Sequence, residues 1–170
     1  FDQPLEQALQ AIARGIHDST PFHVVLVSLY EPETGMLRRV TAVGIPQETL
    51  SELMSRKQPY TSLQQLMRPE FKVSRSYFIP ADETPVLPAE IHYIYVTPPD
   101  AQTQLMKQNA WDPDDFLLIP LEDADGKPLG LISLDNPSNS LRPDHATIEA
   151  IEIFAAQAAQ MISYSQRFSE

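Results

Sequence analysis

Apolar residues recur at helical intervals at both ends of the chain. In residues 1–20, Leu5, Leu9, Ile12 and Ile16 are separated by four, three and four positions, which predicts an amphipathic helix. A second helix is predicted over residues 143–168. Its first apolar stripe consists of Ile148, Ile151, Ala155, Ala158 and Ile162, and its second consists of Phe154, Met161 and Phe168. One stripe can pack on a sheet, which leaves the other for the first helix or for a second subunit.

Between these helices, β-type segments alternate with turn residues. Phe22–Tyr30 and Met36–Ile45 are rich in β-branched and aromatic residues and are separated by Glu31–Gly35, which predicts a hairpin. Two short helices are predicted after Pro46, with Pro59 between them. Residues 22–142 are therefore expected to form the sheet and to hold any pocket.

A strand is predicted from Val73 to Pro80, and a proline-rich connection follows it. Within this connection Ile91–Val96 is compatible with an extra strand or an ordered loop, and Ala101–Asn109 predicts a short helix. Long connections inside compact domains are usually functional or mobile. The sequence leaves open whether residues 81–110 form a lid or a fixed insert.

The clearest local pattern is a second hairpin. Phe116–Glu122 and Lys127–Asp135 are apolar segments joined by a turn that ends in Asp125-Gly126, a pair that favours two-residue hairpin loops. Phe116–Leu121 is apolar on both faces, which is typical of a central strand covered on both sides. Pro120 cannot donate a ladder hydrogen bond, so a bulge or an unpaired position is expected there.

Composition and charge narrow the class of partner. The chain has 170 residues, which fits one domain, and 42% of them are hydrophobic, so it is expected to fold. The formal net charge of −11, with no cluster of Lys or Arg, disfavours nucleic acid and anionic membrane surfaces. The longest apolar segments are too short to span a bilayer. We expect a cytoplasmic protein and, because the chain opens on Phe1, a piece of a longer one.

The sequence offers little chemistry for catalysis. It contains no cysteine, which excludes disulfides, thiolate metal sites, thiol nucleophiles and thioether-linked chromophores. The four histidines have no partner at metal-ligand spacing. Ser133 and Asp135 share one strand face, but a catalytic triad would also need an oriented histidine and an oxyanion hole. Asp135 more simply caps the turn before Pro137. We therefore expect no catalytic residues, no metal site and no enzyme activity of this chain itself.

The order of elements and two groups of residues resemble the GAF domain. The first group is Ser74–Pro80. The second group is Trp111–Asp112, Phe116–Leu121, Gly126, Leu129–Pro137, Arg142–Pro143 and Phe154–Ala159. The resemblance covers nearly all of residues 1–170 and implies a single α+β domain. Its fold would have a central antiparallel sheet of about six strands, the N- and C-terminal helices on one face, and short helices with a long variable loop on the other.

The resemblance also implies a role. Such domains sit in bacterial sensor histidine kinases, cyclic-dinucleotide enzymes and transcription regulators, often as dimers through their terminal helices. Without cysteine this chain cannot anchor a covalent bilin, and the Asn-Lys-x-Phe-Asp-Glu signature of cyclic-nucleotide binders does not occur. The implied function is a sensory domain, most often of a two-component histidine kinase, that binds an unidentified small molecule. The alternative is a ligand-free dimerisation and spacer module.

Two sets of residues are candidates for these roles. The candidate pocket residues are Tyr77, His92, Tyr95, Trp111, Ser133 and Asp135. Aromatic side chains and a few polar groups are typical of small-molecule pockets, although plain packing competes as an explanation for the aromatic ones. The candidate dimer interface, with the terminal helix 143–168 as the signalling helix, consists of Leu5, Leu9, Ile12, Phe154, Ala158, Met161 and Ile162.

Overall fold

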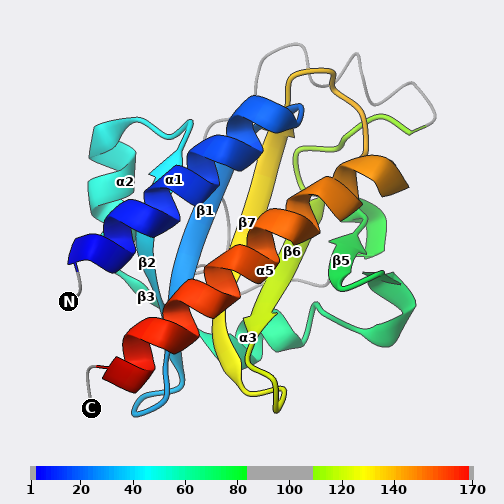
Figure 1. The fold of residues 1–170 in the computed structure, drawn as a ribbon. Coiled ribbons are helices and arrows are strands. Elements are labelled where there is room, and N and C mark those ends of the chain that lie inside the picture. The colour runs from blue at the N-terminus through cyan, green and yellow to red at the C-terminus, as the bar shows by residue number, and fades with distance from the viewer. Residues whose placement is uncertain (1–2, 84–108, 169–170) are drawn as a thin grey trace.

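The chain forms one antiparallel sheet between two layers of helix (Figure 1). The computed structural model describes residues 3–83 and 109–168. The strands are β1 (Phe22–Glu31), β2 (Met36–Val43), β3 (Lys57–Pro59), β4 (Lys72–Val73), β5 (Ser76–Ile79), β6 (Phe116–Glu122) and β7 (Pro128–Pro137). Their order across the sheet is β3-β2-β1-β7-β6-β5-β4. The predicted α+β class is confirmed, with seven strands in the described residues instead of about six because β3 and β4 extend the two edges.

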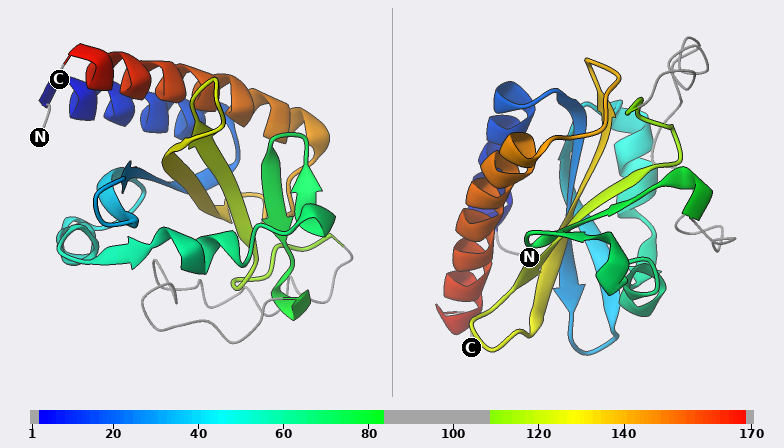
Figure 2. Two further views of the ribbon diagram at one scale, coloured as in Figure 1. Left: turned by 90° about the horizontal axis from the view of Figure 1, so that it is seen from below. Right: turned by 90° about the vertical axis from the view of Figure 1, so that its right-hand side faces the viewer.

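The helices lie on opposite faces of the sheet, as the family resemblance implied. Figure 2 shows α1 (Gln3–Ser19) and α5 (His145–Phe168) side by side on one face. The short helices α2 (Gln47–Met54) and α3 (Tyr60–Gln64) lie on the other. Two 3-10 turns, η1 (Pro69–Phe71) and η2 (Ala81–Glu83), flank the β4–β5 pair. The start of α1 lies beside the end of α5, so both ends of the described chain are at the same end of the molecule.

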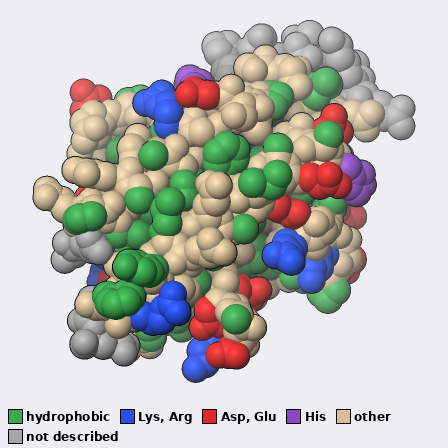
Figure 3. All heavy atoms as spheres, viewed as in Figure 1, with side chains coloured by type: hydrophobic (Ala, Val, Ile, Leu, Met, Phe, Trp, Pro, Cys, Tyr) green, Lys and Arg blue, Asp and Glu red, His purple; other side chains and the backbone are tan. Residues whose placement is uncertain are grey.

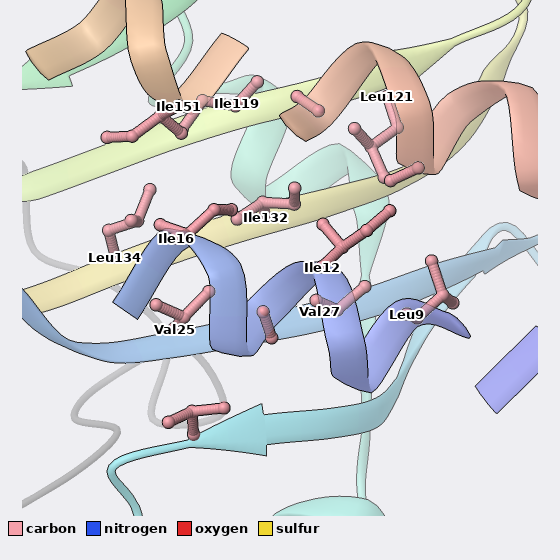
Figure 4. Close-up of a cluster of buried hydrophobic side chains, with 14 of the residues drawn as sticks. Leu9, Ile12, Ile16, Val25, Val27, Ile119, Leu121, Ile132, Leu134 and Ile151 are labelled. Atoms are coloured by element: carbon pink, nitrogen blue, oxygen red, sulfur yellow. The ribbon is translucent and has the colours of Figure 1, made fainter. Parts of the chain in front are cut away.

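The larger core lies between the sheet and the two terminal helices. Figure 4 shows Leu9, Ile12 and Ile16 of α1 directed toward the β1, β6 and β7 side chains, with Ile151 of α5 among them. The two helices approach closely at Gly15, where an added Cβ would lie 2.6 Å from Phe154 Cε1. The stripe on α5 that contains Phe154 is therefore partly used within the chain.

A smaller core covers the opposite face. It consists of Leu37, Tyr60, Leu63, Leu66, Ile79, Leu118 and Leu131. Leu117 and Ile119 of β6 belong to the larger core while Leu118 belongs to the smaller one, so β6 is covered on both faces, as its apolar run predicted. The same strand therefore contacts both the α1–α5 layer and the α2–α3 layer.

Three local predictions differ from the structure. The strand expected from Val73 to Pro80 is interrupted at Ser74, whose φ of 61° turns the chain between β4 and β5. The second hairpin has a loop of residues 123–127 and not a two-residue turn, because Asp123 Oδ1 accepts hydrogen bonds from the backbone N–H groups of Asp125 and Lys127. Pro120 stays in register opposite Leu131, and the irregularity falls between Leu121 and Glu122.

Some predictions fall outside the described residues. The strand or loop expected at Ile91–Val96 and nearly all of the helix expected at Ala101–Asn109 lie within residues 84–108. Of the helices that the structure describes, none combines the length and apolar character that crossing a bilayer requires.

Candidate functional site

A small polar cavity lies on the sheet face that carries α2 and α3. Its volume is about 40 Å³. Strands β2, β3 and β7 contribute Arg39, Gln58, Ser133 and Asp135, and the segment before β6 contributes Asp114 and Asp115. The apolar part of its wall consists of Leu26, Leu63, Pro113, Phe116, Leu118 and Leu134. Small-molecule sites usually have apolar walls and a few convergent polar groups, and this lining combines both kinds of residue.

Arg39 is the most unusual residue of this cavity because its charge is buried. The residue is 4% exposed. Its Nη1 atom donates to the carbonyl oxygens of Leu53, at 3.5 Å, and Arg56, at 3.3 Å, at the end of α2. Carbonyl groups at a helix C-terminus favour a cation, which explains how the guanidinium is held. Burial, with a smaller contribution from the charge of Arg56, lowers the pKa of Arg39 to about 10, so it remains a cation at neutral pH.

Asp115 is a second buried charged residue, at the edge of the cavity. We call its carboxylate and the groups that donate hydrogen bonds to it the Asp115 node. Its carboxylate accepts hydrogen bonds from the backbone N–H groups of Ala81 and Asp112, both at 2.8 Å. The Arg142 guanidinium adds two contacts, Nε at 3.1 Å and Nη2 at 3.4 Å. Burial raises the pKa of Asp115, and the two N–H groups and Arg142 act in the opposite direction. The side chain therefore depends on these donors to remain ionised in the interior.

The Asp115 node connects the cavity to the start of α5. Ala81 and Asp112 lie on either side of residues 84–108, so one carboxylate fixes both flanks of that segment. The backbone N–H of Arg142 donates to the Asn109 carbonyl oxygen at 2.8 Å, which adds a further contact between the residues before α5 and the residues that precede Asp112. Two residues later, Asp144 Oδ1 accepts the Thr147 N–H at 2.8 Å and caps α5. These contacts join the cavity edge to the residues just before the first turn of α5.

A third carboxylate, Glu152, joins the middle of α5 to the β4–β5 turn. It accepts hydrogen bonds from Ser74 Oγ, the Arg75 N–H and Ser76 Oγ, each at 2.7 Å. We call this group the Glu152 clasp. The turn it holds includes the left-handed Ser74, a conformation that costs free energy for a residue other than glycine. Through these three hydrogen bonds the Glu152 carboxylate attaches the β4–β5 edge of the sheet to α5.

The structure brings together only some of the predicted pocket residues. Ser133 and Asp135 line the cavity, as their shared strand face predicted. Trp111 does not, because it packs in the larger core on the helix side, edge-on to Phe22 with ring centroids 5.5 Å apart. Tyr77 packs against the smaller core but does not line the cavity. His92 and Tyr95 lie outside the described residues.

Arg39, Gln58 and Asp115 were not among the predicted pocket residues. Arg39 lies at the same strand alternation as the buried Leu37, which is a signal that sequence reasoning could have used. Gln58 lies on a strand too short to be recognised from its pattern. Asp115 was one of three clustered acids, and only the fold distinguishes it from Asp112 and Asp114.

The predicted dimer residues are mostly internal. Leu9, Ile12, Ala158 and Ile162 are at most 4% exposed and belong to the chain's own core, so their side chains are not on a surface that a partner could reach. Phe154 packs against Gly15, and Leu5 is also buried. Met161 is the predicted residue that remains at the surface, 37% exposed.

An apolar groove nevertheless runs between the terminal helices. Its volume is about 750 Å³, and Leu5, Met161, Tyr164 and Phe168 line it. Figure 3 shows apolar side chains gathered on this surface, most densely where α5 ends at the lower left. The groove lies between the two helices that were predicted to form a dimer interface, but most of the side chains predicted for that interface lie on the inner faces of these helices, and the dimer itself stays a prediction.

Comparison with known proteins identifies the family. A family model of the GAF domain matches residues 4–162. The chain belongs to the GAF family. GAF domains are sensory and regulatory domains. No curated protein matches this sequence significantly.

Solved structures show the same fold at low sequence identity. A GAF domain/HD domain protein from Geobacter sulfurreducens aligns with a TM-score of 0.68 at 11% identity, over 95% of this chain and 94% of that one. The GAF domain of an Acinetobacter phosphoenolpyruvate-protein phosphotransferase gives 0.66 at 12%, over 97% and 85%. A domain from Sinorhizobium meliloti 1021 that carries the name of a two-component sensor histidine kinase gives 0.59 at 14%, over 98% and 99%. These likenesses concern the fold alone.

Proposed function

We propose that this GAF domain is a non-catalytic sensor that binds a small molecule non-covalently in the Arg39 cavity and relays its binding through α5. The observation that carries the proposal is the buried polar lining of that cavity. A concavity with apolar walls and a few convergent polar groups is the usual place for a small ligand in a folded domain. The cavity also lies on the face opposite the terminal helices, which leaves α1 and α5 available for output.

The relay we propose uses the two carboxylate nodes. Asp115 links the cavity edge to Arg142, just before α5, and the Glu152 clasp links β5 to α5 eight residues beyond the Asp144 cap. A ligand that favours one position of this edge would shift α5 only by its differential affinity for the two positions. A differential affinity of about 1.4 kcal/mol already changes the ratio of the two populations tenfold.

The output we propose is a two-component histidine kinase in a bacterial, cytoplasmic signalling protein. The Sinorhizobium meliloti domain supports this context by its name, although its 14% identity supports the fold more directly. In such an assembly two copies would pair through the exposed apolar groove between α1 and α5, formed by Leu5, Met161, Tyr164 and Phe168.

A second candidate function is a ligand-free dimerisation and spacer module. The observation that favours it is the cavity volume of about 40 Å³. Pockets that enclose an entire small-molecule ligand usually have a volume of roughly 300 Å³ or more. In this case the buried polar groups would serve only to hold α2 and the Asp115 node in place.

A thermal-shift screen separates the two functions. Cyclic nucleotides, haem, bilins, amino acids and organic acids are each titrated while the unfolding midpoint is followed. A sensor gives a concentration-dependent rise for at least one class, because a ligand that binds only the folded state stabilises it. The spacer gives none.

Matched variants then locate the binding. Ser133→Leu fills the cavity and is expected to abolish the ligand-induced rise. Ser138→Leu, at an exposed position just past β7, is expected to leave the rise unchanged. A rise that survives Ser133→Leu would place the ligand elsewhere and refute the proposed site.

A further inference from the structure

We propose that His17 and His23 form a binding site for a divalent transition-metal ion such as zinc at the junction of α1 and β1. This inference is independent of the Arg39 cavity and adds a second ligand site to the chain. It depends on the distance between the two imidazole rings, on the contact that orients the His17 ring and on the nitrogen atoms that both rings leave unpaired.

The fold brings together two histidines that do not lie at a metal-ligand spacing in the sequence. His17 lies in the last turn of α1, and His23 is the second residue of β1. The two ring centroids are 5.4 Å apart, and the ring planes are inclined by 56°, so the rings are not stacked. Helical or strand periodicity cannot predict this pair, because it forms across the turn that joins the two elements.

The distance between the rings fits two imidazoles on one ion. Zinc lies about 2.0–2.1 Å from a ligating histidine nitrogen, and that nitrogen lies about 1.2 Å from its ring centroid. At a tetrahedral angle these lengths place the two centroids about 5.2 Å apart. The observed separation of 5.4 Å is close to this value, so an ion between the rings requires little movement of the backbone.

Asp18 determines which nitrogen of His17 is available. His17 Nδ1 lies 3.1 Å from Asp18 Oδ1. An ionised carboxylate only accepts hydrogen bonds, so Nδ1 carries the hydrogen atom and Nε2 keeps its lone pair. A carboxylate that holds the far nitrogen is a common partner of a metal-ligating histidine. Among the described residues Nε2 has no hydrogen-bond partner, so it is available to an ion.

His23 is accessible and is not held by the rest of the described chain. The residue is exposed, and the described residues provide no hydrogen-bond partner for its ring nitrogens. Gly44 lies against the ring, where an added Cβ would be 3.2 Å from His23 Cδ2. A nitrogen of His23 can therefore turn toward His17 without breaking a hydrogen bond within these residues.

The charges on α1 do not oppose a cation at this end of the helix. Arg14, the only Lys or Arg of α1, lies one turn before His17, and the Asp18 carboxylate offsets its charge. The carbonyl groups at the C-terminus of a helix add a partial negative charge. The formal net charge of the chain, −11, acts in the same direction.

The number of ligands sets the class and strength of binding. No group of three or more side chains that could hold a metal ion occurs in residues 3–83 and 109–168. Water molecules would therefore complete the coordination, and we expect weaker binding than at a structural zinc site with four protein ligands. Imidazole ligands favour zinc, nickel and copper, whereas magnesium and calcium favour oxygen ligands.

The test measures zinc binding to the domain without a histidine tag. Isothermal titration calorimetry with zinc chloride is expected to show one ion per chain. At tenfold excess over its dissociation constant, zinc is expected to raise the unfolding midpoint by roughly 3–5 °C, because it binds the folded pair more tightly than separate histidines. Magnesium chloride at the same ionic strength is expected to leave the midpoint unchanged.

Single substitutions assign the ion to the pair. His17→Ala and His23→Ala each remove one ligand, so the affinity for zinc should fall at least tenfold in each. Asp18→Asn keeps both ligands but loses the charge that orients His17, and should weaken binding about tenfold. His145→Ala removes an exposed histidine at the start of α5 and should bind zinc within about twofold of wild type. Circular dichroism checks that each variant is folded.

The outcomes are distinguishable. Zinc binding that is weakened by substitution of either histidine of the pair, and not by His145→Ala, supports the inference. Binding that survives His17→Ala or His23→Ala overturns it, as does the lack of saturable binding up to about 1 mM zinc. An equal effect of magnesium shows unselective attraction to an acidic surface and also overturns it. Loss of binding in His145→Ala or His92→Ala alone places the ion elsewhere and refutes the proposed pair.

Discussion

Asp115 is the residue on which the geometry of the cavity edge depends most. Its carboxylate is fully buried in the ion pair with Arg142, and four donors from three parts of the chain converge on it. Such a group stabilises the fold only while its donors are present, because a buried charge without them is costly.

Replacing the Asp115 carboxylate tests this dependence. Asp115→Asn keeps the shape of the side chain but turns an NH₂ group toward one of the hydrogen-bond donors. The free energy of unfolding is expected to fall by about 2 kcal/mol. The loss is no larger because Arg142 is partly exposed and solvent screens the ion pair. Chemical denaturation measures the change. Asp125→Asn, at the exposed tip of the β6–β7 loop, is the control and should change it by less than about 0.5 kcal/mol. Equal effects of the two variants would show that Asp115 is not a structural node.

At the residue scale the sequence predicted part of the site. Ser133 and Asp135 followed from strand alternation, which is a local property. Trp111 was misplaced because aromatic character does not say which face of a sheet a loop residue reaches. Arg39 was missed because its role depends on the end of α2, fourteen residues away in the sequence, whose carbonyl groups receive its guanidinium.

At the scale of elements, β5 acts as a short link between two anchored ends. Its N-terminal end is held to α5 by the Glu152 clasp, and just past its C-terminal end the Ala81 N–H is held by Asp115. Tyr77 and Phe78 pair with Leu118 and Leu117 of β6 between these anchors. In the relay that we propose, β5 connects the cavity edge to α5 through these two anchored ends.

Removing the charge of Glu152 should loosen that link. Glu152→Gln weakens three charge-assisted hydrogen bonds at once, so the free energy of unfolding is expected to fall by about 1–2 kcal/mol. Amide hydrogen exchange should speed up at Arg75 and Ser76 in particular. Glu149→Gln, one turn earlier on the exposed side of α5, is the matched control and should leave both quantities unchanged. Unaltered exchange at the β4–β5 turn in Glu152→Gln would refute the clasp.

Elements with strong local patterns were predicted well, and those made by tertiary contacts were not. The terminal helices and both hairpins follow from periodicity and turn residues. Strands β3 and β4 have three and two residues, too few to show any period, and exist because they pair with β2 and β5. The break at Ser74 was hidden because serine gives no local sign of a left-handed conformation, which here is accompanied by the Glu152 contacts.

At the scale of the whole molecule, the terminal helices form one continuous layer that carries both the core and the exposed groove. Buried positions of α5 face the sheet, while Tyr164 and Phe168 are 60% and 73% exposed. The fold class and this layer were predicted from the family resemblance, since no single local pattern specifies how helices and a sheet stack.

Substitutions at two neighbouring positions of α5 distinguish the loss of dimerisation from the loss of folding. Met161→Glu places a charge in the groove and should convert a dimer to a folded monomer. Ile162→Glu buries a charge in the core and should unfold the domain, because Ile162 is 1% exposed. Light scattering and circular dichroism distinguish these results. A wild-type protein that is monomeric at high concentration would contradict the proposed dimer.

We propose that binding of a ligand in the cavity alters α5. Hydrogen exchange of the wild-type domain with and without a saturating stabilising compound from the thermal-shift screen measures this directly. We expect slower exchange in β2 and β3 around Arg39 together with altered exchange in the first half of α5, from the Asp144 cap to Glu152. Identical exchange rates along α5 in the two conditions would contradict it.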